Sequence, residues 1–325
     1  MSALARIAAF AGLLAAVFAG AALAGSKLDP DVETPSSADL GGHTDMNGHQ
    51  GAPEVVADPG HDASPVDAAL PGLAVAQSGY QLVPEQTELA SDSGARYAFR
   101  ITEADGQTVQ DFDTEHERRM HLIVVRRDFE NFQHLHPEQL ADGSWTAEAD
   151  LEQAGVYRVF ADFATAGESL TLATDLFVAG QFNPRPLPGP VTTASAGDGY
   201  QVAVESSAPR SVAATQVRFS VSRNGEELES VEPYLGADGH LVALREHDQA
   251  FLHTHPEGEA GGPGPISFQV HYPTPGRYRL FLQFKHRGEV RTAAFTQEVA
   301  DPGAETQGDG GSESHGELEG ADHGH

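Results

Sequence analysis

The chain has 325 residues, enough for two ordinary domains and tails, and its 48 acidic and 19 basic side chains give a formal net charge of -29. Such an excess of acid excludes the phosphate-neutralising surface of a nucleic-acid-binding protein and disfavours anionic lipid surfaces as partners. Because the sequence has no cysteine, disulfide bonds, thiolate metal ligands and cysteine nucleophiles are excluded too.

The first segment, residues 1–25, is typical of an export signal. Arg6 precedes an uncharged apolar stretch, and residues 22–24 have the small-x-small form that signal peptidase cleaves. The stretch has about 18 residues, near the minimum length for a membrane-spanning helix. A cleaved signal peptide and a retained signal-anchor helix both remain open. Either one places the rest of the chain outside the cytoplasm, secreted or anchored to the cytoplasmic membrane through this segment alone.

Two segments lack apolar periodicity. Residues 26–71 are rich in Pro, Gly, Asp and Ser, and residues 301–325 are rich in Gly, Glu and Asp with scattered histidines. Both compositions are typical of chain that cannot bury an apolar core. We therefore predict a disordered linker before the folded part and a disordered acidic, His-containing tail after it.

An internal repeat dominates the folded part. Residues 132–138 read Phe-Gln-His-Leu-His-Pro-Glu and residues 251–257 read Phe-Leu-His-Thr-His-Pro-Glu, and each is preceded by a His-Leu run. Three histidines recur at one constant spacing of 119 residues: His121, His134 and His136 correspond to His240, His253 and His255. The repeat predicts two modules, residues 72–181 and residues 195–300, joined by a Pro-rich hinge at residues 182–194.

Each module contains short runs rich in Val, Leu, Phe and Tyr, separated by Gly, Asp and Pro turns. The runs lie at residues 97–101, 121–125, 156–163 and 170–178, and again at residues 217–221, 241–244, 266–270 and 278–284. Such spacing is typical of an antiparallel sandwich of immunoglobulin-like size. The predicted fold class is all-β: two tandem immunoglobulin-like antiparallel β-sandwiches, with disordered N- and C-terminal tails and an N-terminal apolar helix.

The histidines of each copy are expected to converge. Residues two apart in a strand point to the same face, so His134 and His136 project together. A hairpin through residues 126–128 would return the chain beside the strand that begins at His121. Three such imidazoles can hold copper, zinc or nickel. The prediction is two metal sites, His121 with His134 and His136, and His240 with His253 and His255, with His116, His247, Glu138 and Glu257 as candidate fourth or outer ligands.

Other interpretations stay open. The proline after each motif could simply end a strand, with the histidines ordering a loop in a structural or interaction module of the cell envelope. Catalysis is disfavoured: a metallopeptidase of the JAMM type needs an aspartate where Ala147 stands and a serine where Pro263 stands. A copper/zinc superoxide dismutase needs a disulfide that this chain cannot form. No Gly-x-Ser-x-Gly, phosphate-loop or His-Glu-x-x-His motif occurs.

The signature resembles a group of exported actinobacterial proteins with a duplicated module. The resemblance covers residues 70–300 and rests on Met-His-Leu-x-Val-Val-x-Arg-Asp at residues 120–128, on the Phe-x-His-x-His-Pro-Glu motif, and on Tyr-Leu-Gly-Ala-x-Gly-His-Leu-Val at residues 234–242. Such proteins are similar to YtkA-like, copper-associated β-sandwich domains. The resemblance implies a heavy-metal-binding or copper-tolerance protein.

Together these features predict a non-enzymatic, extracytoplasmic protein that binds copper, or else zinc, for metal buffering, delivery or tolerance. Its expected partners are metal ions and a membrane or envelope protein, and nucleic acid is not among them.

Overall fold

The computed structural model describes residues 70–206, 209–252, 254–258 and 260–303. Within these residues all regular secondary structure is β-strand, and no helix there is long and apolar enough to cross a membrane. The predicted N-terminal helix, nearly all of the predicted linker and most of the predicted C-terminal tail lie outside the described residues.

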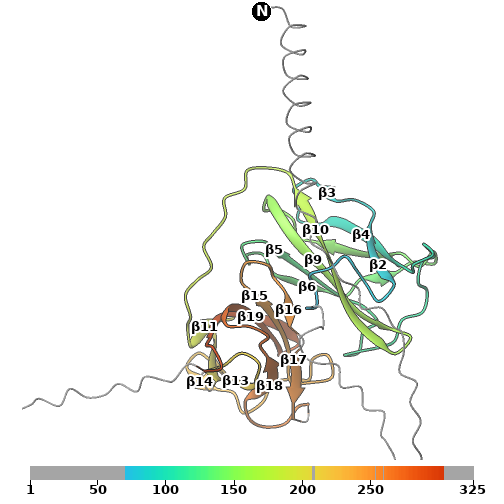
Figure 1. Ribbon diagram of the computed structural model, residues 1–325. Helices are drawn as coiled ribbons and strands as arrows, with labels where there is room; N and C mark the ends of the chain where they lie inside the picture. The colour runs from blue at the N-terminus through green and yellow to red at the C-terminus, as the bar shows by residue number, and fades with distance from the viewer. Residues whose placement is uncertain (1–69, 207–208, 253, 259, 304–325) are drawn as a thin grey trace, which may run out of the picture. The chain divides into compact units, whose positions relative to one another are not determined.

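The first module is a sandwich of two five-stranded sheets (Figure 1), ordered β1-β2-β4-β8-β7 and β3-β10-β9-β5-β6. Neighbouring strands are antiparallel except β3, which runs parallel to β10. The strands are β1 (Ala76–Gln77), β2 (Tyr80–Pro84), β3 (Glu88–Leu89), β4 (Ala95–Thr102), β5 (His121–Arg126), β6 (Gln133–Leu135), β7 (Glu138–Gln139), β8 (Trp145–Ala149), β9 (Gly155–Thr165) and β10 (Glu168–Val178).

The second module repeats this plan with antiparallel sheets ordered β11-β12-β13-β18-β17 and β16-β15-β19-β20, and β14 also pairs with β13. Its strands are β11 (Thr193–Ser195), β12 (Tyr200–Ser206), β13 (Ala214–Arg223), β14 (Glu226–Glu227), β15 (His240–Arg245), β16 (Phe251–Leu252), β17 (Thr254–Glu257), β18 (Ile266–His271), β19 (Gly276–His286) and β20 (Glu289–Val299).

Period-two burial explains why these segments form sandwich strands. In β13, Val217, Phe219 and Val221 are buried in the core of the second module, whereas the residues between them point outward. Each module also contains a tyrosine corner, a hallmark of immunoglobulin-like sandwiches: the Tyr157 hydroxyl donates to the Gln153 carbonyl (2.7 Å) and the Tyr278 hydroxyl to the Thr274 carbonyl (2.8 Å). The predicted fold class of two tandem immunoglobulin-like sandwiches is confirmed for the described residues.

The two modules dock through one face of each. The apolar runs of β5 and β15 do not alternate with polar residues, because each strand is buried on both faces. Alternate side chains enter the module's own core, and the others enter a third apolar cluster. We call this cluster the junction core; its buried members are Ile123, Val125, Phe129, Phe160, Ala173, Val242, Leu244, Phe251 and Phe281.

Aromatic contacts show that the docked faces are equivalent. Phe132 stacks on Phe281 with ring centroids 4.0 Å apart, and Phe160 packs on Phe251 at 5.6 Å. Phe251 and Phe281 are the repeat equivalents of Phe132 and Phe160. Replacing each residue of the first contact by its equivalent in the other module therefore gives the second contact. The junction therefore has the self-complementary form of an isologous interface, built within a single chain.

Candidate metal centre

The first three histidines lie at the edge of the junction core. His121 begins β5 and is buried, on the same face of the strand as Ile123 and Val125. β6 pairs antiparallel with β5, and His134 lies directly opposite Ile123. His136 follows β6, where the chain crosses to the other sheet. The predicted hairpin of the first module is confirmed, and its side chains point into the junction.

The three imidazoles converge closely. Ring centroids are 5.2 Å apart for His121 and His134, 5.3 Å for His121 and His136, and 4.8 Å for His134 and His136. One ring nitrogen from each residue lies within 4.8 Å of the other two. Two imidazoles bonded to one ion at about 2 Å have centroids roughly 4.5–6 Å apart, so this spacing suits a shared ion.

His240, from the second module, joins this cluster. It begins β15 on the face that enters the junction core, as His121 does in β5. Its ring centroid is 4.6 Å from that of His134 and 5.7 Å from that of His121, and the rings of His240 and His121 are nearly parallel at 7°. The docking of equivalent faces thus brings together histidines that the sequence assigned to separate sites.

The other two histidines of the second copy take a different course. His253 lies outside the described residues, and His255 is exposed on β17. The predicted hairpin is wrong for His255, because β16 ends at Leu252 and β17 pairs with β18 in the opposite sheet, with His255 facing Gln269. In the first module the chain crosses between sheets only after His134, so the copies of the motif differ here.

The candidate outer ligands also separate. His116 lies on an exposed loop with its ring centroid 6.1 Å from His121 and 6.0 Å from His240. His247 is almost fully exposed beside Glu246, and Glu138 is exposed on β7. Glu257 accepts a hydrogen bond from Gln216. Of these four residues, His116 alone shows ring contacts with the cluster.

Hydrogen-bond partners fix the protonated nitrogen of two rings. The Nε2 atom of His121 lies 3.2 Å from the Glu115 carbonyl oxygen, which only accepts, so Nε2 carries the hydrogen. The Nδ1 atom of His134 lies 2.7 Å from Oε1 of Gln283 and donates to it. The Gln283 amide nitrogen in turn donates to the Thr292 hydroxyl at 3.4 Å, which sets the orientation of that amide.

These assignments leave two unprotonated nitrogens facing each other. With hydrogens on Nε2 of His121 and Nδ1 of His134, the lone pairs of His121 Nδ1 and His134 Nε2 meet across 2.9 Å. Two neutral rings cannot form a hydrogen bond there; only a proton or a metal ion between them relieves the repulsion. Nε2 of His136 is also buried and has no hydrogen-bond partner. One ring nitrogen from each of the three histidines therefore lies within 4.8 Å of the other two, and two of these nitrogens face each other unprotonated.

The surroundings of the cluster disfavour protonation of its imidazoles. Burial, together with the neighbouring imidazoles, lowers the pKa of His134 to about 3 and that of His136 to about 4. Burial also lowers the pKa of His121, and it lowers that of His240 well below its ordinary value. The rings are neutral at pH 7, which is the form of imidazole that binds metals.

Acid should destabilise the metal-free protein through this cluster. Imidazoles of the unfolded chain take up protons near pH 6.5, whereas His136 and His134 in the folded protein do so only near pH 4 and 3. Between these values the unfolded state binds more protons, so stability falls as pH falls from 6.5 and His134 contributes up to about 1.4 kcal/mol per pH unit. Urea unfolding with chelator at pH 7.5 and 5.0 measures this, and an equally steep loss in His134→Ala would contradict it.

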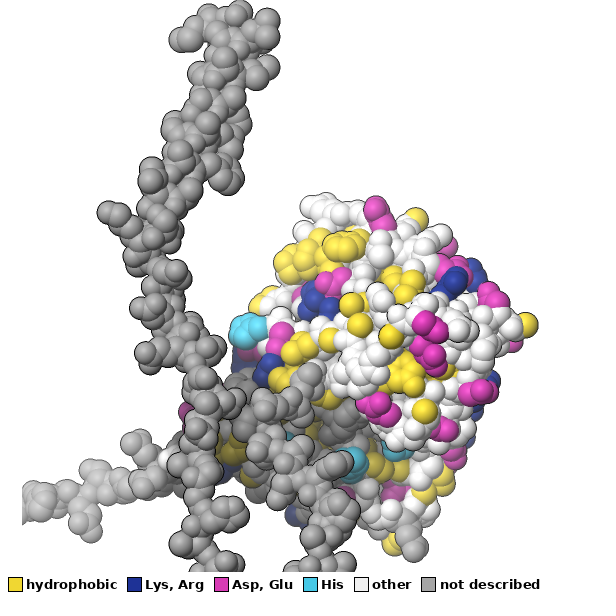
Figure 2. Space-filling model, turned by 45° about the vertical axis from the view of Figure 1, so that its right-hand side comes forward, with side chains coloured by type: hydrophobic (Ala, Val, Ile, Leu, Met, Phe, Trp, Pro, Cys, Tyr) yellow, Lys and Arg dark blue, Asp and Glu magenta, His cyan; other side chains and the backbone are white. Residues whose placement is uncertain are grey.

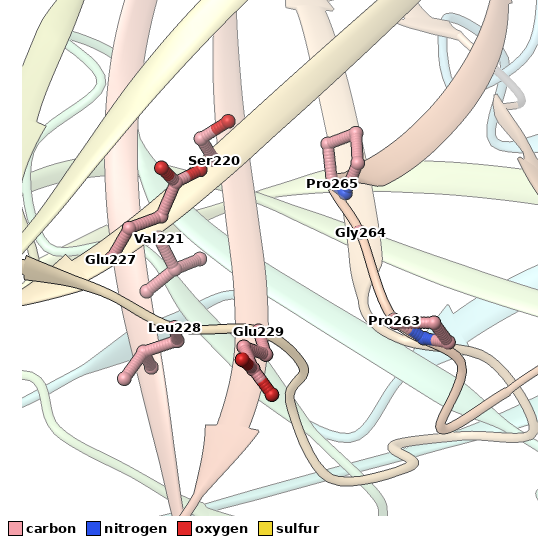
Figure 3. Close-up of a pocket in the computed structure, with 8 residues that line it drawn as sticks. All are labelled: Ser220, Val221, Glu227, Leu228, Glu229, Pro263, Gly264 and Pro265. Atoms are coloured by element: carbon pink, nitrogen blue, oxygen red, sulfur yellow. The ribbon is translucent and has the colours of Figure 1, made fainter.

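Other surface features offer weaker candidates. Figure 3 shows the hollow between β13, β14 and the loop before β18, where Glu227 and Glu229 lie on one side and Pro263, Gly264 and Pro265 on the other. It has no imidazole and only two carboxylates. Figure 2 shows acidic side chains scattered over one face of the molecule rather than gathered. The better candidate for specific chemistry is thus the group of histidines at the edge of the junction core, His121, His134, His136 and His240, which we call the junction cluster.

The folded part is a tandem of immunoglobulin-like sandwiches with a histidine cluster where they dock. The chain belongs to the family described as "Domain of unknown function (DUF8832)", whose model matches twice, at residues 75–180 and 193–301. A search of curated proteins finds no match.

Among solved structures, the chain is similar to Yersinia pseudotuberculosis InvD, with 12% identity over 72% of this chain and 61% of that one and a TM-score of 0.24. It is also similar to the Escherichia coli adhesin FdeC, with 14% identity over 70% of this chain and 66% of that one and a TM-score of 0.22. The chain thus spans less than two thirds of either protein. TM-scores this low support no conclusion about function.

The sequence analysis did not predict that Gln283 bonds to His134, nor that His240 lies beside the three histidines of the first module. The available signal was the unbroken apolar run after each strand-initial histidine, Leu-Ile-Val-Val after His121 and Leu-Val-Ala-Leu after His240. Such runs indicate strands buried on both faces, and hence modules that cover each other.

Proposed function

We propose that this protein is a non-enzymatic, extracytoplasmic metal-binding protein that holds one divalent transition metal ion, copper or zinc, at the junction cluster. The observation that supports it is the pair of unprotonated nitrogens, His121 Nδ1 and His134 Nε2, 2.9 Å apart. Each ring donates its other N–H to an oxygen, as metal-bound histidines do in known sites. Nε2 of His136, which is buried and has no hydrogen-bond partner, is the third proposed ligand.

The nitrogen spacing favours copper over zinc. Two nitrogens 2.9 Å apart, each at a bond length of about 2.0–2.1 Å, subtend about 90° at the ion. That is the angle between neighbouring ligands in the tetragonal geometry of Cu(II), whereas tetrahedral Zn(II) needs the nitrogens to move apart. Zinc thus remains the second candidate.

The predicted export signal and the acidic surface support metal buffering, delivery or tolerance outside the cytoplasm. A net charge of -29 attracts cations and suits neither nucleic acid nor anionic lipid. The partner to which metal would pass is proposed to be a membrane or envelope protein.

A second function is favoured by a separate observation. The tandem is locked by a buried junction core, and polar contacts add to it: Arg127 donates to the Asp248 carbonyl and Gln249 to the Arg126 carbonyl. A rigid pair of sandwiches suits a structural or interaction module of the cell envelope. The histidines would then serve only to pack the edge of that junction.

Calorimetric titration of the full chain with Cu(II) and Zn(II) separates the two functions. We expect one tight site per chain, and an unfolding temperature that rises with metal because the ion binds the folded state; a hundredfold excess over Kd adds about 2.7 kcal/mol. A matched variant replaces His43, His49, His315, His323 and His325 with alanine. If binding disappears in that variant, the tails hold the metal and the site at the junction is wrong. If the wild-type chain binds no metal tightly, the metal function is wrong and the structural one stands.

A further inference from the structure

We propose that the second module completes the metal centre, with His240 as a fourth imidazole and Gln283 as the residue that positions His134, so that the bound ion ties the two modules together. This inference rests on the proposed metal-binding function and adds to it which module supplies which group. A site confined to the first module would need neither residue.

The position of Gln283 follows from the repeat. His121 lies opposite Asp162 on the neighbouring strand β9, and His240 lies opposite Gln283 on β19. Docking of the two faces carries Gln283 across the junction to the ring of His134, where its Oε1 accepts the Nδ1 hydrogen at 2.7 Å. This bond holds the unprotonated Nε2 of His134 toward His121. The second module thereby selects the tautomer that can ligate metal.

His240 lies closer to the cluster than the alternative fourth ligand. Its ring centroid lies 4.6 Å from that of His134 and 5.7 Å from that of His121, and the ring stacks on both. The described residues whose ring nitrogens all lie within 4.8 Å of one another are the three histidines of the first module, so the His240 ring has to turn about its side-chain torsions before a nitrogen reaches their ion. His116 is exposed, and its centroid is 6.1 Å from His121. His240 is also fixed in a strand, whereas His116 sits in a loop with a left-handed φ of 46°. The geometry therefore favours His240.

A shared ion couples metal binding to docking. Three ligands come from β5, β6 and the residue after β6, and the fourth from the first residue of β15. An ion bound by both sides stabilises the docked state in proportion to its preference for that state. Loss of metal would leave the junction core intact but remove its link at the histidine edge.

The test uses the full chain, three single variants of the proposed centre and one control variant. Gln283→Leu removes the acceptor with little change in size, and Gln283→Glu restores an oxygen acceptor. His240→Ala removes the fourth imidazole. The control is His255→Ala, which removes an exposed imidazole on β17. Circular dichroism and thermal unfolding with chelator confirm that each variant folds.

Cu(II) and Zn(II) affinities and the nitrogen hyperfine pattern of bound Cu(II) are the readouts. We expect Gln283→Leu to weaken binding by about 10–100-fold, the range for outer-sphere partners of metal-bound histidines, and Gln283→Glu to recover most of the loss. His240→Ala should weaken binding at least tenfold and remove one nitrogen from the Cu(II) spectrum. His255→Ala should change neither readout.

Each outcome bears on a different statement. Tight binding in the wild-type chain that is unchanged in His240→Ala and Gln283→Leu would overturn the shared centre and leave a site confined to the first module. Equal losses in Gln283→Leu and Gln283→Glu would overturn the positioning role. Absence of tight binding in the wild-type chain would overturn the proposed function itself, and the shared centre with it.

Discussion

Replacing His134 with alanine is expected to weaken metal binding by roughly a hundredfold or more, the largest effect of any single substitution in the cluster. His134 faces His121 of its own module at 2.9 Å and donates a hydrogen bond to Gln283 of the second module. Its removal deletes one of the two facing nitrogens and leaves no pair of ligands 2.9 Å apart.

Titration of His134→Ala with Cu(II) and Zn(II), beside His255→Ala, measures this effect. The metal-free stability of the same variants decides between the two functions. If the cluster is a metal site, His134→Ala weakens metal binding strongly but changes the stability of the metal-free protein little. The reason is that two facing lone pairs repel each other and do not stabilise the metal-free fold. Loss of metal-free stability with metal affinity unchanged would instead identify His134 as a packing residue.

The fold was predictable because its signal is local. Each strand of a sandwich is a short apolar run between turn residues, and the repeat shows that one pattern was folded twice. The hairpin that brings His134 opposite β5 follows from the short loop between the two runs, and β5 pairs with β6 as expected. Tyr157 and Tyr278 lie in the equivalent predicted runs 156–163 and 278–284, and both are buried.

The composition of the cluster was not predictable in the same way. Which strand face a module turns to its partner depends on the summed packing of many side chains far apart in sequence. His240 and His134 are 106 residues apart, and their contact exists only because Val242 and Leu244 pack into the same cluster as Ile123 and Val125. Gln283 carries no motif at all, and its role follows from a cross-strand position together with docking.

The course of the second motif shows a further limit. The two copies share Phe-x-His-x-His-Pro-Glu, yet β16 stops at Leu252 and β17 joins the opposite sheet two residues later, at Thr254, with His255 exposed. In the first copy the strand continues through Leu135 before the crossing. A shared motif therefore does not guarantee shared strand pairing, since sheet membership is set by partners that the motif does not contain.

The second large effect concerns the junction core, where Phe281→Ala is expected to cost about 3–5 kcal/mol. Phe281 is buried and stacks on Phe132 of the first module at 4.0 Å with an 8° angle between the rings. Its deletion opens a cavity between the modules and removes an aromatic pair worth about 0.5–1.5 kcal/mol beyond its buried area. The cores of the two modules are left complete.

Phe284 provides the matched control, because it lies on the same strand, is equally buried, and belongs to the core of the second module instead. Phe284→Ala should lower the unfolding temperature of the second module itself, whereas Phe281→Ala should split one calorimetric transition into two, because the modules then unfold independently.

Added Zn(II) should bring the two transitions of Phe281→Ala back together if an ion spans the junction. A single transition in Phe281→Ala without metal, displaced exactly as far as in Phe284→Ala, would show that the junction core does not govern coupling between the modules.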